Sequence, residues 1–176
     1  MKLDVLPAKE PWYADGLSFT CTQCGNCCTG GPGFVWISDE EVERLAQFMK
    51  LSVEETRSKY CRKVGRRWSL NEHRTREGNY DCVFLTSIPD SRPKKKELSP
   101  GQAIPHPKRG CSIYSVRPLQ CRTWPFWHSN LENEEMWEIA GRKCPGLNRG
   151  NRTFSQAEIE RLRDAEDWPE NPPGSK

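Results

Sequence analysis

Four cysteines fall within eight residues, CTQCGNCC at positions 21–28, and the last two are adjacent. A C-x2-C turn can bring two sulfurs to one metal ion, and this spacing recurs in zinc and iron–sulfur sites. Successive side chains in extended backbone point to opposite sides, so four thiolates from this octet would enclose one ion only under strain. The octet therefore predicts that Cys21, Cys24, Cys27 and Cys28 share their site or sites with cysteines from elsewhere.

Four remote cysteines are candidates for this role, and each lies in a segment that contains proline, glycine or an aromatic residue. They are Cys82, Cys111, Cys121 and Cys144. Cys144 precedes a proline, as does the final cysteine of bacterial ferredoxin runs. Eight such thiols are enough for two four-thiolate centres, or for one centre with spare thiols. Cys61 stands apart at the end of a predicted helix and is interpreted as a small buried hydrophobic residue.

Only 35% of the 176 residues are hydrophobic, so a single domain of this length has a small core that cross-links can support. The first sixteen residues lack the apolar stretch of a signal peptide, and no apolar run is long enough to span a bilayer. A cytoplasmic location is therefore expected, without a membrane partner. Thiols are kept reduced there, which favours metal ligands over disulfides.

Three capping boxes predict three short helices, because a serine and the glutamate three residues later can satisfy each other's backbone N–H groups. The pairs are Ser38 with Glu41, Ser52 with Glu55, and Ser155 with Glu158. Apolar or β-rich runs predict strands at 34–37, 66–70, 81–85, 110–116 and 135–141. The expected fold is a small, irregular, metal-organised α+β domain with short helices and a few strands.

The predicted organisation has four parts. An N-terminal extension (1–18) precedes the cysteine-cluster domain (19–167), which carries a basic proline-rich loop (87–109), and a disordered tail follows (168–176). Within residues 91–110, six Lys or Arg accompany one Glu and four Pro, which predicts a solvated loop. Phosphate binding is an alternative for this loop. The net charge of only +3, with no aromatic residue among the basic ones, argues against a nucleic-acid partner.

The segments FTCTQCGNCC, CVFL, CSIYSVRPLQCRTWPF and CPG together resemble the YkgJ-family cysteine-cluster proteins, the CxxCxxCC type, described as zinc- or iron-chelating domains. The resemblance runs from about Phe19 to Gly146 and places all eight candidate cysteines on the family's cysteine positions. Cys61 and the segment between Thr86 and Lys108 depart from the pattern. The resemblance implies metal binding, with an iron–sulfur cluster preferred, but no settled reaction.

Positive charge near the cysteines supports a metal independently. Four thiolates around Zn(II), or around a 4Fe–4S core of charge +2, leave a net charge of about −2 that needs hydrogen-bond donors or cations beside it. Arg117 and Arg122 flank Cys121 and are predicted to contact the cofactor, the alternative being solvated surface cations. RTWPFW, which follows Cys121, is interpreted as hydrophobic core, and no histidine is assigned as a ligand.

The chain carries no recognisable catalytic signature, since a phosphate-binding glycine loop, an H-E-x-x-H motif and a dinucleotide fingerprint are all absent from the sequence. Two hypotheses follow. In the first, the chain is a metal-binding protein acting in electron transfer, iron handling or docking to a protein partner. In the second, it is an enzyme or enzyme component whose cluster acts on a substrate. A structural zinc interaction domain is a further alternative, because all-thiolate sites suit zinc as well as iron.

Overall fold

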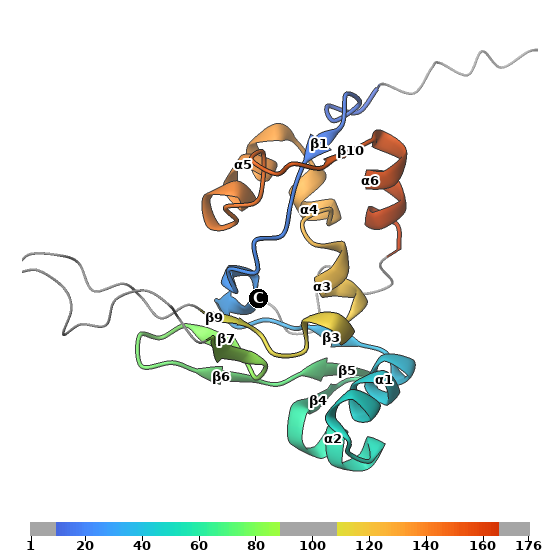
Figure 1. The fold of residues 1–176 in the computed structure, drawn as a ribbon, viewed down its shortest axis with the longest axis vertical. Coiled ribbons are helices and arrows are strands. Elements are labelled where there is room, and N and C mark those ends of the chain that lie inside the picture. The colour runs from blue at the N-terminus through green and yellow to red at the C-terminus, as the bar shows by residue number, and fades with distance from the viewer. Residues whose placement is uncertain (1–9, 89–108, 166–176) are drawn as a thin grey trace, which may run out of the picture. The chain divides into compact units, whose positions relative to one another are not determined.

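The computed structural model describes residues 10–88 and 109–165 (Figure 1). Most of the predicted basic loop, part of the predicted N-terminal extension and the predicted tail lie outside these ranges. The described residues divide into two compact units: a first unit of residues 10–21 and 123–165, and a second unit of residues 22–88 and 109–122. Short helices and small sheets occur together, which confirms the predicted α+β class.

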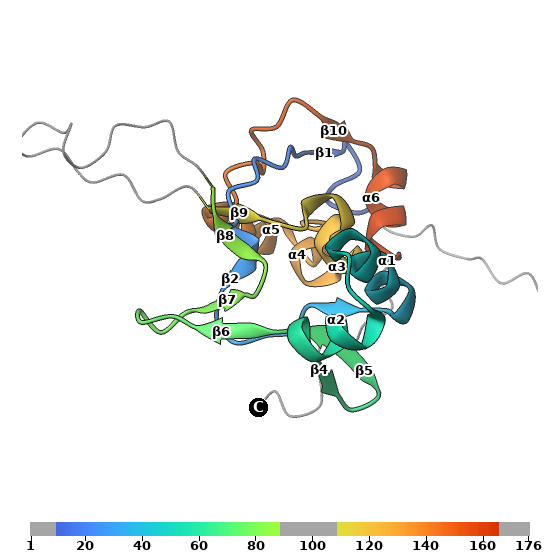
Figure 2. The ribbon, with the colours of Figure 1, turned by 60° about the horizontal axis from the view of Figure 1, so that its bottom comes forward.

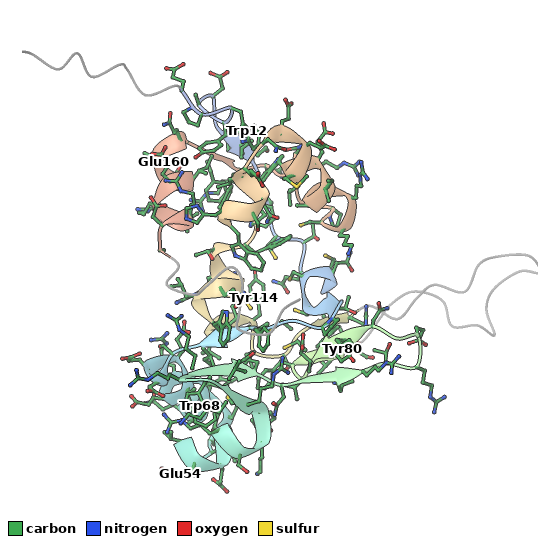
Figure 3. The ribbon with its side chains drawn as sticks, turned by 180° about the vertical axis from the view of Figure 1, so that it is seen from behind. Trp12, Glu54, Trp68, Tyr80, Tyr114 and Glu160 are labelled. Carbon is green, nitrogen blue, oxygen red and sulfur yellow. The ribbon has the colours of Figure 1, made fainter. Side chains whose placement is uncertain are left out.

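The first unit packs three helices against a short pair of antiparallel strands. Its elements are β1 (Leu17–Ser18), β10 (Thr153–Phe154), α4 (His128–Leu131), α5 (Glu134–Lys143) and α6 (Gln156–Arg163). Trp137 lies in its core, stacked on Phe126 at 5.7 Å between ring centroids, and its indole N–H donates to Asn148 Oδ1 at 2.8 Å. Trp12 packs against Trp137 and donates to the Leu131 carbonyl (Figure 3). Buried Phe126 confirms that the RTWPFW segment contributes to the core.

Helix α5 replaces the strand predicted at 135–141, which was wrong. The Asn133 side chain caps this helix by accepting a hydrogen bond from the Met136 N–H at 3.0 Å. Trp137 and Ala140, three residues apart, are buried on one face of the helix. Glu, Met and Ala also favour a helix over a strand by intrinsic propensity. The aromatic and branched residues of the segment suggested a strand, but their helical spacing decided the outcome.

The second unit joins two helices to three small sheets, whose strands are hydrogen-bonded in antiparallel pairs. The two helices are α1 (Asp39–Met49) and α2 (Val53–Tyr60). The unit also contains the 3-10 turns η1 (Asn26–Cys28) and η3 (Tyr114–Val116), and the short helix α3 (Leu119–Thr123) connects it in sequence to the first unit. The sheets are β3 (Trp36–Ile37), β5 (Arg67–Leu70) and β4 (Cys61–Val64); β2 (Thr29–Gly30), β7 (Tyr80–Cys82) and β6 (Glu72–Arg74); and β8 (Leu85–Ser87) with β9 (Arg109–Cys111).

All three predicted capping boxes are present, each with both of its reciprocal hydrogen bonds, at the starts of α1, α2 and α6. Val42, Leu45 and Ala46 of α1 are buried, as their helical spacing predicts. Together with Ile37, Leu70, Phe84 and Ile113, this face of α1 forms the core of the second unit. Local hydrogen bonding and one apolar stripe are therefore sufficient to set these helices.

The predicted strands at 34–37 and 66–70 are confirmed by β3 and β5, which pair Ile37 with Trp68. The segment 81–85 is instead divided, because a turn at Val83 and Phe84 separates β7 from β8. The strand predicted at 110–116 is wrong beyond Cys111. The chain turns there to bury Ile113 in the core and continues as η3. Within the described ranges, no helix is both long and apolar enough to cross a bilayer.

Candidate metal centre

The second half of the cysteine octet forms a tight turn, not extended backbone. Gln23 and Gly25 have positive φ angles of 54° and 74°, and the Cys28 N–H donates to the Gly25 carbonyl at 2.9 Å to close η1. As a result the Sγ atoms of the adjacent Cys27 and Cys28 lie 3.8 Å apart. The 3-10 turn thus removes the difficulty that extended backbone would pose for adjacent ligands, because both thiols lie close together.

Gly25 brings this turn close to the β8–β9 hairpin. A Cβ atom at Gly25 would lie 2.7 Å from Leu85 Cδ1 and 3.4 Å from the Arg109 carbonyl oxygen. Its positive φ is also a conformation that other residues rarely adopt. Both constraints act at the point where the octet passes the strand that carries Cys111, so Gly25 sets how closely the two segments approach.

Gly25→Ala is expected to lower the free energy of unfolding by more than the roughly 1–2 kcal/mol that a left-handed conformation alone costs a non-glycine residue. The excess arises from the contact with Leu85. Gly78→Ala is the matched control, because Gly78 has a φ of 87° but open space around its missing Cβ. Urea denaturation of both variants measures the difference. If both variants lose the same free energy of unfolding, strands β8 and β9 move to accommodate the added methyl group at no extra cost.

Five thiols of the second unit interact with one another, and we call them the thiol cluster. They are Cys27, Cys28, Cys82, Cys111 and Cys121. The Cys28 thiol hydrogen-bonds to both Cys27 and Cys111. Cys82 and Cys121 interact electrostatically with Cys27 and Cys111. Turn η1, strands β7 and β9, and helix α3 each supply at least one of these side chains. Figure 1 labels β7, β9 and α3.

The cluster favours thiolate charge at some of its cysteines and opposes it at others. Hydrogen bonds to Cys111 and Cys27, reinforced by burial, raise the pKa of Cys28. The bond from Cys28 lowers the pKa of Cys111 to about 7, whereas burial raises the pKa of Cys82 to about 11. Burial and the neighbouring cysteines raise the pKa of Cys121 well above its ordinary value. A bound cation would stabilise the thiolate form of all five, so the chemistry of this donor set suits a thiolate-bound metal.

The remaining predicted ligands are Cys21, Cys24 and Cys144. Cys24 belongs to the second unit and is partly exposed. In the first unit, Phe19 bridges Leu147 and the Thr20 N–H donates to the Gly146 carbonyl at 3.2 Å. The paired residues lie just before Cys21 on one segment and just after Cys144 on the other. Across the described ranges, no three His, Cys, Asp or Glu side chains surround a common point as closely as the ligands of one ion.

Cys61 is confirmed as a core residue. It is 7% exposed, lies in β4 and packs in the hydrophobic core of the second unit. Burial raises its pKa to about 11. A thiol in such surroundings stays protonated and is chemically inert.

The two predicted cofactor-binding arginines have different surroundings. Arg117 lies over the ring of Tyr114, 3.8 Å from its centroid, and donates to the Tyr114 carbonyl at 2.7 Å (Figure 3). Its positive charge favours the thiolate forms of Cys27, Cys111 and Cys121, although the hydrogen bond with Cys28 at Cys27 and Cys111, and burial at Cys121, have larger effects on the pKa. Arg122 instead forms an ion pair with Glu41 at 3.3 Å. Arg117 is therefore the arginine whose charge acts on the thiol cluster in this structure.

Two residues that the sequence did not mark as functional hold the helix carrying Cys121. Gln120 Oε1 accepts a hydrogen bond from the Trp36 N–H at 2.6 Å, while its Nε2 donates to the Phe34 carbonyl at 3.2 Å. Glu41 Oε1 accepts from the Leu119 N–H at 2.7 Å. The sequence predicts the role of Glu41 in its own capping box. It gives no signal that Glu41 or Gln120 contacts a segment about 80 residues away.

Thiols gathered from separate short elements of a small α+β chain define a cysteine-cluster metal-binding domain as the class of this protein. The chain belongs to the CxxCxxCC family, described as "putative zinc- or iron-chelating domain", whose sequence model matches residues 20–145. This match confirms the resemblance found in the sequence. Zinc or iron chelation is accordingly the activity indicated by family membership.

One similar curated protein is the uncharacterized protein MJ0661 of Methanocaldococcus jannaschii, which is 26% identical over 114 residues. The aligned region covers 65% of this chain and 48% of the relative, so the chain spans about half the length of that protein. No solved structure matches the chain.

Proposed function

We propose that the chain binds an iron–sulfur cluster through cysteine thiolates centred on the thiol cluster. One observation carries the proposal: five cysteines from four separate segments interact within the second unit, where the Cys27 and Cys28 Sγ atoms lie 3.8 Å apart and the Cys28 thiol also hydrogen-bonds to Cys111. Arg117 adds a positive charge beside them, which suits a centre whose net charge is about −2. Cys21, Cys24 and Cys144 are proposed as further ligands, on the basis of their positions in the family pattern.

Iron–sulfur is preferred to zinc because of the spacing of the thiols. The C-x2-C-x2-C run and the Cys144-Pro145 pair are features of ferredoxin-type ligation. Structural zinc sites more often use two separated C-x2-C pairs. The hydrogen bond between Cys28 and Cys111 supports a site that combines this run with a cysteine of a remote strand.

A role in electron transfer, iron handling or docking to a protein partner is preferred to catalysis. Eight candidate thiols exceed the four that a closed site needs, so full ligation is readily satisfied and no open iron position is required. A cluster with an open position would instead support an enzymatic role. A reducing compartment such as the cytoplasm suits thiols of this kind.

The proposal is tested by analysing protein purified anaerobically without added metal. Iron and acid-labile sulfide in matching amounts, with broad visible absorption, are expected. Zinc alone in a colourless protein would replace the iron–sulfur proposal with a structural zinc domain. Protein that is folded but contains neither metal, and that takes up neither on reconstitution, would overturn metal binding itself.

A further inference from the structure

We infer that Asp81 is a positioning residue that sets the relative placement of three segments of the thiol cluster. The inference rests on the proposed thiolate-bound metal, but it concerns a carboxylate that is not a ligand in the family pattern. Asp81 lies in β7 directly before Cys82 and is only 7% exposed. A buried carboxylate needs partners for both of its oxygens, and the identity of these partners carries the inference.

Each carboxylate oxygen of Asp81 binds a segment that bears a different cysteine. Oδ1 accepts a short hydrogen bond from the hydroxyl of Thr29, the residue that follows Cys28. Oδ2 accepts a hydrogen bond from Arg109 Nη1 at 3.0 Å and forms an ion pair with it. Arg109 lies two residues before Cys111. Because Asp81 is itself adjacent to Cys82, one side chain links three segments that each carry a thiol of the cluster.

Backbone pairing alone provides only part of this connection. Strands β2 and β7 are hydrogen-bonded, with Thr29 opposite Asp81, so the Thr29 bond reinforces an existing register. Strand β9, by contrast, belongs to the separate β8–β9 sheet, whose strands are labelled with β7 in Figure 2. The ion pair between Asp81 and Arg109 therefore joins two sheets that share no strand.

Such a residue is expected to act on the metal through its ligands. Residues that hydrogen-bond or orient metal ligands typically change metal affinity by about 10–100-fold when they are mutated. In Asp81→Asn, one oxygen remains for Thr29, but the amide N–H2 group would then face the Arg109 guanidinium, donor against donor. Strand β9 stays paired with β8, but its ion pair to β7 is lost, so the placement of Cys111 relative to Cys82 is less tightly held.

The test uses Co(II) as the probe, added anaerobically to the reduced, metal-free full chain in competition with a chelator. Asp81→Asn is expected to weaken Co(II) binding by about 10–100-fold and to alter the thiolate-to-cobalt absorption bands. Asp39→Asn is the matched control, because Asp39 also pairs with an arginine, Arg57 at 2.6 Å, but on the exposed surface of α1. It should match the wild type in affinity and spectrum.

Thr29→Val and Thr29→Ser provide a second pair, in case Asp81→Asn does not fold. Valine removes the hydroxyl and should weaken Co(II) binding, whereas serine keeps the hydroxyl and should restore it. If Thr29→Val and folded Asp81→Asn both bind Co(II) with the affinity and spectrum of the wild type, the role of Asp81 is overturned but the proposed function is not. Failure of the wild type to bind Co(II) or iron through its thiols would overturn the proposed function together with this inference.

Discussion

Cys121→Ser is expected to leave the protein with little bound metal and a much lower free energy of unfolding. Apparent binding free energies of structural thiolate sites are about 10–16 kcal/mol, and this energy contributes directly to folding. The loss of one ligand should therefore destabilise the protein by roughly 3 kcal/mol or more, beyond the effect of most single substitutions. The second unit is especially sensitive, because its sheets have only two or three strands each.

Metal content per chain and urea denaturation measure this effect, and Cys61→Ser is the matched control. It makes the same sulfur-to-oxygen exchange at a buried thiol of the same unit. The buried hydroxyl costs about 1–3 kcal/mol, but metal content should stay at the wild-type value. A Cys121→Ser protein that retains its full metal content would remove Cys121 from the site.

Glu41→Ala is expected to cause the second largest loss, because this carboxylate links α1 to the helix that carries Cys121. Its side chain is 8% exposed and accepts hydrogen bonds from the Ser38 and Leu119 N–H groups. Losing the capping box costs about 1 kcal/mol, and an unsatisfied buried N–H costs about 1–3 kcal/mol. The exposed partners Arg44 and Arg122 add little. A total loss of about 2–4 kcal/mol is therefore expected.

Glu55→Ala separates the two contributions of Glu41. Glu55 holds the same capping-box position in α2, but it is exposed and its carboxylate accepts only from Ser52. This variant should lose less stability than Glu41→Ala and keep its metal affinity, whereas Glu41→Ala should lower both because α3 is released. Equal effects of the two substitutions on unfolding and on metal titration would show that the contact with Leu119 contributes nothing.

Several features were predictable because their physical causes are local. A capping box is complete within four residues, so α1, α2 and α6 could be predicted from their serine and glutamate pairs. Cys61 could be predicted as a core residue from its isolation from the other motifs. The strand predicted at 135–141 was wrong because an aromatic-rich segment carries both strand and helix signals, and packing of Trp137 selected the helix.

Predicting the neighbours of each thiol required distances that local patterns do not carry. The octet was expected to hold its adjacent thiols apart, but positive φ angles at Gln23 and Gly25 created a turn that brings Cys27 and Cys28 together. Similarly, the flanking arginines looked equivalent in sequence. In the structure Arg117 acts on the cysteines, while Arg122 pairs with Glu41, a residue from another helix.

The sequence by itself determined the family, the thiol chemistry and the helices with local caps, because motif spacing and capping act over a few residues. The tertiary structure alone decided which cysteines are neighbours and what holds them in place. Contacts such as those of Asp81 and Gln120 join residues 28 to 86 positions apart. They depend on how small sheets and helices pack, and no local pattern in the chain encodes that packing.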